Sequence, residues 1–183
     1  MKKILTVAVI AITTAFQSFA QVKNIELQAA GLTCSICSKA VYKAISAVPF
    51  VKEVKANIKT SSYTISLKDE NIFDFDALKK AVVGAGFSVA KLTANISFIN
   101  AVIENDTHLK YFGKTFHFMN VKSQTLNGDY AITMLDKNFV TNKEFKTNSK
   151  FTKMKCYESG TMESCCTKPN KIGERIYHIT LKS

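Results

Sequence analysis

The sequence predicts an α+β protein in which a βαββαβ unit is followed by a small all-β half. Two observations lead to this prediction. Residues 22–93 interleave short stretches of alternating apolar and polar residues with two stretches of helical periodicity, whereas residues 95–183 show mainly strand-like stretches. A chain of 183 residues is long enough for two small domains, and its 46% hydrophobic content is sufficient for a packed core.

The first twenty residues have the pattern of a secretion signal. Lys2 and Lys3 precede a short apolar stretch, and Ser18-Phe19-Ala20 places small residues where a signal peptidase cuts. The apolar stretch is short for a membrane span, which makes an uncleaved anchor the less favoured alternative. We therefore expect residues 1–20 to be removed, and the mature protein to be periplasmic or secreted with no integral membrane segment.

The formal charge of +11 does not indicate nucleic-acid binding. The lysines are scattered and Arg175 is the one arginine, whereas specific reading of bases depends on arginine. We expect this charge to favour solubility, with attraction to anionic surfaces as a second consequence. Nucleophile elbows, phosphate-binding glycine loops and His-Glu-x-x-His sequences do not occur, so we expect a protein that is not an enzyme.

Residues 21–93 predict the first domain, with its elements in the order β-α-β-β-α-β. Thr33 is a plausible N-cap for the first helix, and Pro49 ends that helix. The residues that establish the alternating strands are Ile25, Leu27 and Ala29, then Val54, Ala56 and Ile58, then Tyr63, Ile65 and Leu67, and finally Phe87 to Leu92. The two helices are indicated by Cys37, Val41, Ile45 and Val48, and by Phe75, Leu78, Val82 and Ala85.

Cys34 and Cys37 are the candidate metal ligands. They stand where the first strand turns into the first helix, so the positive end of the helix dipole favours their thiolate forms. Two thiolates on one loop suit a soft ion of low coordination number such as Cu(I). Zn(II) usually requires four ligands, and the neighbouring sequence supplies no others.

This loop resembles the heavy-metal-associated domain family, whose members include copper chaperones, modules of copper-exporting ATPases and a periplasmic mercury-binding protein. The family motif is Gly-Met-Thr-Cys-x-x-Cys, and this sequence reads Gly31-Leu32-Thr33-Cys34-Ser35-Ile36-Cys37, with Leu in place of Met. Gly86-Phe87 is similar to the family's pair before its last strand. The resemblance covers residues 22–93. It implies a ferredoxin-like fold and transfer of Cu(I), with Hg(II) or Zn(II) as alternatives, to or from a metal donor or acceptor protein.

Other functions remain open for the same residues. In an oxidising compartment Cys34 and Cys37 could rest as a disulfide or act in thiol–disulfide exchange, although the surroundings typical of thioredoxin-like proteins are missing. A protein-interaction module that acts through the second half is a further alternative.

Residues 95–183 predict a small β domain of unknown role. Strand-like stretches occur at 116–121, 130–135 and 176–181, and Asn127-Gly128 is a hairpin signal between the first two. Phe139-Val140 and Phe145 indicate further short strands. We favour a five-stranded OB-like barrel over a sandwich.

The second half also holds three cysteines, Cys156, Cys165 and Cys166, with Met154 and Met162 among them. A disulfide from Cys156 to one of the adjacent pair is the favoured interpretation outside the cytosol. A second soft-metal site of thiolates and thioethers is the alternative. The three histidines, His108, His117 and His178, are scattered along the chain, so we expect packed or surface side chains there and not ligands.

Overall fold

The computed structural model describes residues 21–164, 166 and 172–182, so the predicted signal peptide lies outside the described residues. The first half contains β1 Gln21–Ala30, α1 Ser35–Ser46, β2 Val51–Asn57, β3 Ser62–Leu67, α2 Phe75–Gly84 and β4 Ser88–Ile103. The second half contains β5 His108–Tyr111, β6 Lys114–Phe118, β7 Gln124–Met134, α3 Asn142–Asn148, η1 Ser149–Phe151, α4 Cys156–Ser159 and β8 Ile176–Leu181. In this described part, no helix has the length and apolar character needed to cross a membrane.

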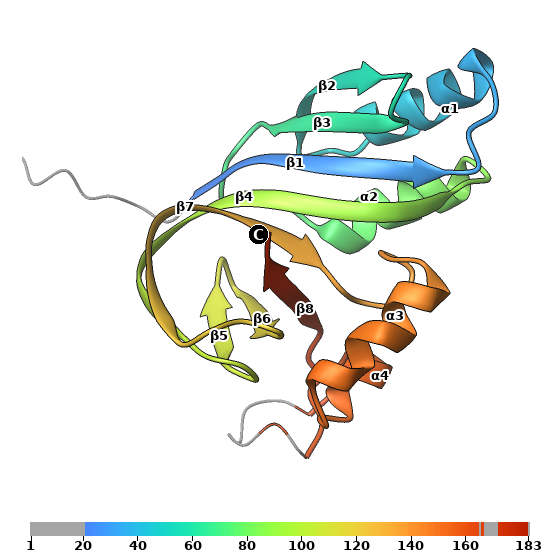
Figure 1. Cartoon of the computed structure of the whole chain (residues 1–183). Helices are drawn as coiled ribbons and strands as arrows, with labels where there is room; N and C mark the ends of the chain where they lie inside the picture. The colour runs from blue at the N-terminus through green and yellow to red at the C-terminus, as the bar shows by residue number, and fades with distance from the viewer. Residues whose placement is uncertain (1–20, 165, 167–171, 183) are drawn as a thin grey trace, which may run out of the picture.

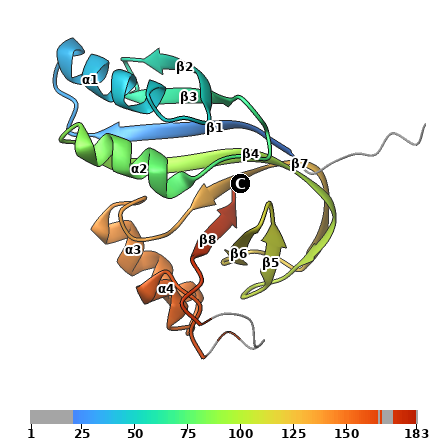
Figure 2. The same ribbon diagram turned by 180° about the vertical axis from the view of Figure 1, so that it is seen from behind.

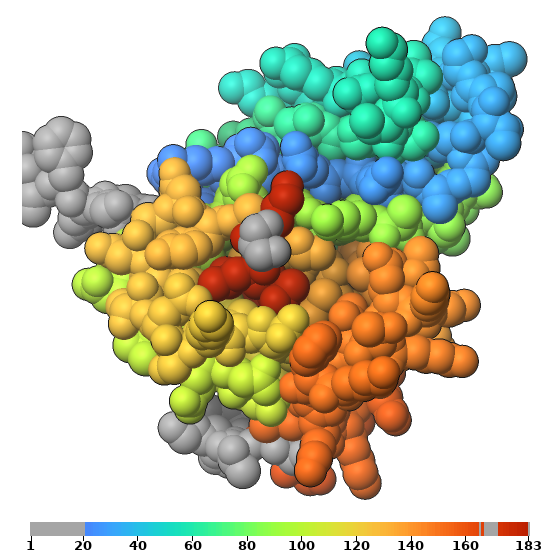
Figure 3. All heavy atoms as spheres, in the orientation of Figure 1, coloured from blue at the N-terminus to red at the C-terminus, as the bar shows by residue number. Residues whose placement is uncertain are grey.

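The eight strands of the described residues belong to one sheet, in the order β2-β3-β1-β4-β7-β8-β6-β5 (Figure 1). The first four strands pair antiparallel, and α1 and α2 cover one face of this part of the sheet, as the reverse view shows (Figure 2). This arrangement confirms the ferredoxin-like βαββαβ prediction for the first half. The space-filling view shows α1, β2 and β3 at one end of the molecule and the orange segment that contains α3 and α4 at the other (Figure 3).

The two helices of the first half form because their apolar residues recur on one face. In α1 that face carries Val41 and Ile45, both fully buried, and the hydroxyl of buried Tyr63 on β3 donates to the Ser38 carbonyl at 3.1 Å. The N-cap of α2 is Asp74, whose side chain accepts hydrogen bonds from two backbone amides of the first turn. Each fully buried aliphatic side chain stabilises the fold by roughly 1.5–3 kcal/mol, which is the main reason that the helices stay on the sheet.

Strand β4 is much longer than the sequence predicts. The predicted strand over 87–92 forms only its beginning, and β4 continues to Ile103 across the predicted boundary at residue 94. Its first part pairs with β1 as far as Ser97, and from Thr93 onward its other edge pairs with β7. The two halves therefore share one strand, and no linker separates them.

The predicted OB-like barrel is not confirmed, because the sheet is not closed: β2 and β5 lie at its two ends. The second half is also not all-β, since it contains α3, η1 and α4. Phe145, predicted in a strand, lies in α3, where Thr141 forms a capping box with Glu144. Phe139 is in a turn, and Val140 forms only an isolated bridge with Lys137.

The Asn127-Gly128 pair does not form the predicted hairpin turn. Both residues lie inside β7, and Gly128 faces Phe98 of β4, next to a register shift between Phe98 and Ala101. Gly128 has a φ of +100°, a conformation that a residue with a side chain rarely adopts. Gly128 therefore lies at an irregularity in the pairing of β4 with β7. A glycine within a strand often marks such a bulge and not a turn.

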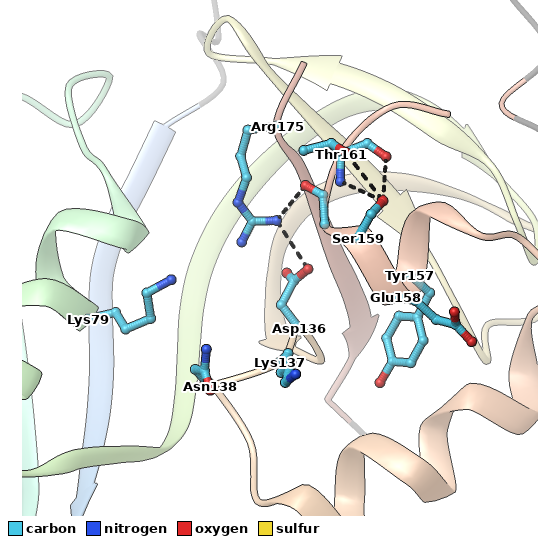
Figure 4. Close-up of a pocket in the computed structure, with 10 residues that line it drawn as sticks. Lys79, Asp136, Lys137, Asn138, Tyr157, Glu158, Ser159, Thr161 and Arg175 are labelled. Carbon is cyan, nitrogen blue, oxygen red and sulfur yellow. Dashed lines mark hydrogen bonds and ion pairs between the residues drawn. The ribbon is translucent and has the colours of Figure 1, made fainter. Parts of the chain in front are cut away.

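A network of charges centred on Arg175 ties the second half to α2. The Arg175 guanidinium donates to Asp76 at 2.8 Å and to Asp136 at 3.1 Å, and the pair with Asp136 is visible in Figure 4. Lys79 also donates to Asp76 at 2.6 Å. Burial raises the pKa of Asp76, but the hydrogen bonds and charges of Arg175 and Lys79 outweigh this and hold the pKa at about 2.

This network predicts a specific loss of stability in acid. Because the pKa of Asp76 is depressed on folding, its contribution is fully present above about pH 4 and is lost as the pH falls towards 2. Allowing for partial exposure, we expect Asp76→Asn to lower the free energy of unfolding by about 1–2 kcal/mol at pH 7, and by much less near pH 2. Urea unfolding of both proteins at pH 7, 4 and 2.5 measures the difference.

Asp129→Asn provides a matched control. Asp129 also pairs with a lysine, Lys23, at 2.5 Å, but both side chains are about half exposed. An exposed pair contributes little, so this variant should unfold almost as the unaltered protein does. A loss in Asp76→Asn that is the same at every pH would contradict the assignment.

Candidate metal site

The Cys34–Cys37 loop lies between the end of β1 and the start of α1. Gly31 makes the turn with a φ of +84°, which favours glycine. The N-cap of α1 is Cys34 and not the predicted Thr33: the Cys37 amide donates to the Cys34 sulfur at 3.3 Å. The helix therefore begins on one candidate ligand, and the second lies within its first turn, which places both sulfurs at the positive end of the helix dipole.

The two sulfurs are close together and accessible. Cys34 Sγ and Cys37 Sγ are 2.7 Å apart, Cys34 is exposed and Cys37 is half-buried. Small rotations of the side chains would bring them to the roughly 4 Å that two thiolates on one ion require. Between them, Ile36 is 78% exposed. The loop thus presents two sulfurs and one apolar side chain to solvent.

Two apolar side chains lie beside the loop. Leu32, which stands where the family motif has Met, is partly buried and packs against the main hydrophobic core. The ring of Phe87 lies beside Gly31, 3.8 Å from the position that a Cβ there would occupy. The Gly86-Phe87 pair therefore lies next to the Cys34–Cys37 loop.

The pKa of Cys37 is lowered from its ordinary value. The hydrogen bond from Cys34 is the largest cause, burial opposes it, and bonds from the backbone and hydroxyl of Thr33 add to the lowering. The Cys37 thiol therefore ionises more readily than the thiol of an ordinary cysteine. Thiolate is the form that binds soft metals and also the form that attacks disulfides.

The ligand set of the loop is limited to these two sulfurs. Among the residues that the structure describes, neither Cys34 nor Cys37 belongs to a group of three or more His, Cys, Asp or Glu side chains that could hold one ion. A pair of thiolates suits a soft ion of low coordination number, whereas a structural Zn(II) site needs four ligands.

The structure brings together other residues that the sequence left apart. Cys156 and Cys166 are buried; Cys156 lies close to all three histidines, and Cys166 lies close to His108. His117 and His178 are fully buried, and Cys165 lies outside the described residues. Burial, with the neighbouring imidazoles of His178 and His108, lowers the pKa of His117 to about 4. The sequence does not predict this cluster, because the histidines come from three different strands, Cys156 from α4 and Cys166 from a loop, and they share no spacing motif.

The hydrogen bond from Cys34 predicts a measurable change in Cys37. Replacing Cys34 with Ala removes the largest cause of the lowered pKa, so the pKa of the Cys37 thiol should rise towards its ordinary value. The pH dependence of iodoacetamide alkylation, followed on the peptide that contains Cys37, measures it. Thr33→Val, which removes a smaller contribution, should give a smaller rise; an unchanged profile in Cys34→Ala would show that Cys34 does not lower this pKa.

Comparisons with known proteins cover this part of the chain. A model of the family described as the heavy-metal-associated domain matches residues 26–88. Copper-transporting ATPase 2 of Rhizobium meliloti is 42% identical over 66 residues, and the "Probable copper-exporting P-type ATPase" of Archaeoglobus fulgidus is 30% identical over 80 residues. These alignments cover 36% and 44% of this chain, but only 8% and 10% of the length of those two relatives.

One solved structure is of similar size to the first half. The crystal structure of oxidized MerP from Ralstonia metallidurans is 33% identical, with 37% of this chain and 96% of that chain aligned and a TM-score of 0.34. The match to the family model spans the Cys34–Cys37 loop, both helices of the first half and the start of β4. Residues 26–88 of this chain therefore belong to the heavy-metal-associated domain family.

Proposed function

We propose that this protein is exported, binds Cu(I) through the thiolates of Cys34 and Cys37, and passes the ion to or from a partner protein by ligand exchange. The observation that carries the proposal is the arrangement of the loop. Two adjacent sulfurs are exposed at a helix N-terminus, and no third ligand of the described residues joins them. Its family supports heavy-metal binding, and the ATPases it resembles are named for copper transport.

The loop geometry supports transfer by exchange of thiolates. Because Cys34 is exposed, a thiolate of a partner can approach the ion before either ligand leaves. The ion then passes through a state with three sulfur ligands, and the cysteines of this chain dissociate one at a time. No electron is transferred, and each sulfur of the donor is replaced by one of the acceptor. The exposed side chain of Ile36 gives the partner an apolar contact beside the ligands.

The choice of Cu(I) follows from coordination number. Cu(I) is stable with two thiolates, whereas Zn(II) would have to recruit two more ligands from a partner or from water. Hg(II) shares the preference of Cu(I) for two sulfurs and is the nearest competitor. The predicted signal peptide supports a site of action in the periplasm or outside the cell.

Thiol–disulfide exchange is the second candidate function. The 2.7 Å separation of the sulfurs and the lowered pKa of Cys37 favour it as well as metal binding. The two functions differ in what the pair must do: a carrier holds an ion between two reduced sulfurs, whereas a redox protein alternates between dithiol and disulfide.

A competitive titration tests the main proposal. Reduced residues 21–183 are titrated with Cu(I) against a chromophoric chelator without oxygen, beside Cys34→Ser/Cys37→Ser. We expect an equivalent of tightly bound Cu(I) in the unaltered protein that the double variant holds more than about a hundredfold more weakly. Loss of a group that only orients a metal ligand costs about 10–100-fold, and loss of both ligands should exceed that.

Ser35→Ala is the matched control, since it changes a residue of the same loop without removing a sulfur, and it should leave the affinity unchanged. Equal affinity in the native protein and the double variant would refute the proposal. A failure to bind, combined with turnover of a disulfide substrate that depends on both cysteines, would establish the redox function in its place.

A further inference from the structure

A row of three histidines crosses the sheet in the second half. His108 on β5 pairs in register with His117 on β6, and His117 pairs in register with His178 on the parallel strand β8. Residues paired across neighbouring strands point to the same face of a sheet, so the three imidazoles lie side by side. The ring centroids of His108 and His117 are 4.3 Å apart, and those of His117 and His178 are 4.9 Å apart.

The innermost imidazole has an unused nitrogen. His178 is fully buried, and its Nδ1 lies 2.8 Å from Oδ1 of Asp136, a buried carboxylate that also accepts from Arg175. An ionised carboxylate only accepts, so Nδ1 of His178 carries the proton and Nε2 offers a lone pair. Among the described residues, this buried Nε2 has no hydrogen-bond partner.

The middle imidazole has the opposite orientation. His117 is also fully buried, and its Nε2 lies 2.9 Å from Asp106 Oδ1, so Nε2 donates and Nδ1 offers the lone pair. That Nδ1 is 3.7 Å from the sulfur of buried Cys156. Nitrogen and sulfur ligands of one tetrahedral ion are separated by about 3.6 Å, from metal distances of about 2.0–2.1 and 2.3 Å.

We infer that His117, His178 and Cys156 form a second, buried metal site for a thiophilic cation, separate from the Cys34–Cys37 loop. In the reduced protein, one ligand atom from each of the three lies within 4.8 Å of the others, as a shared ion requires. Each imidazole is held by a carboxylate on its other nitrogen, as metal-bound histidines usually are. In Figures 1 and 2 the strands β6 and β8 and helix α4 lie well away from the β1–α1 connection.

The outer part of the cluster supplies further ligands and a route for the ion. His108 and Cys166, with Cys156, form a second group of ligand atoms within the same 4.8 Å limit. Met154 and Met162 pack against the buried cluster that contains both cysteines and Ile176. A pocket of about 620 Å³ reaches His108, Cys166 and Met162 from the surface. The carboxylates of Glu104, Asp106 and Glu174 line this pocket and favour a cation, although Lys110 pairs with Glu174 at 3.5 Å and offsets part of their charge.

Simple packing does not account for the cluster. Stacking of the rings would explain the distances between them, and a hydrogen bond from the Cys156 thiol would satisfy Nδ1 of His117. Nε2 of His178 and Nε2 of His108 would still be buried without hydrogen-bond partners among the described residues. Buried polar atoms are rarely left without a partner. A bound ion would accept the lone pair of His178 Nε2. The mixed thiolate and imidazole ligands suit Cu(I) or Zn(II).

The test uses the Cys34→Ser/Cys37→Ser protein, so it does not depend on the proposed function of the loop. Under reducing conditions this protein is titrated separately with Cu(I) and with Zn(II) against chelators, and with Co(II) to detect a thiolate charge-transfer band. We expect one equivalent of one of these ions, with affinity lowered at least a hundredfold by adding Cys156→Ala or His117→Gln. Asp106→Asn, which affects a positioning residue, should lower it about 10–100-fold. Asp129→Asn is the distant control and should leave it unchanged.

Nuclear magnetic resonance of histidine nitrogens keeps the inference testable if a core variant fails to fold. In the metal-free Cys34→Ser/Cys37→Ser protein, His178 should carry its proton on Nδ1 and His117 on Nε2. Added ion should shift the other nitrogen of each ring. The inference would be overturned if the Cys34→Ser/Cys37→Ser protein bound no equivalent of any of these ions. It would also be overturned if the bound equivalent persisted after His117→Gln was added and the resonances of His178 Nε2 and His117 Nδ1 did not shift.

Discussion

The backbone ladder along β4 is the constraint on which the rest of the structure depends. Its sixteen residues pair with β1 at one end and with β7 at the other, and both edges are paired between Thr93 and Ser97. A buried backbone amide or carbonyl without a partner is costly, so each strand fixes the position of the next along the sheet. Through this strand the position of β7, and then of β8 and β6, follows from that of the metal-binding half.

The first half could be predicted from sequence because its signals are local. Val41 and Ile45 recur at helical spacing, and Cys34 and Cys37 share one helical turn, so a short window of sequence contains the site. The predicted N-cap, Thr33, is one residue early, because the cap is decided by which side chain reaches the Cys37 amide. That contact depends on backbone geometry that residue preferences do not specify.

The second half could not be predicted to the same extent, because its signals depend on tertiary pairing. Asn127-Gly128 has the composition of a hairpin turn, but the register with β4 places it in the middle of a strand. His117 and His178 are far apart in the chain and meet through parallel pairing of β6 with β8. Register between such distant strands is decided by the whole sheet, and no spacing motif records it.

The two cysteine-containing sites differ in how their ligands meet solvent. At the loop, Cys34 is exposed at the N-terminal end of a helix. In the second half, Cys156 and the imidazoles of His117 and His178 are fully enclosed, and carboxylates fix the orientation of the rings. Exposure favours rapid exchange of ligands, whereas enclosure with carboxylates that hold the ligands in place favours retention.

The shared strand also decides how the sheet meets other molecules. In an isolated four-stranded unit of this kind β4 would be an outer strand, open to pairing with another chain, but here β7 covers it from Thr93 onward. The remaining outer strands are protected differently: β5 has only four residues, and β2 exposes the charged side chains of Lys52, Glu53 and Lys55. Association by strand addition is therefore disfavoured at these edges. A protein that exchanges metal with this one would meet it through side chains around the β1–α1 connection and not by extending the sheet.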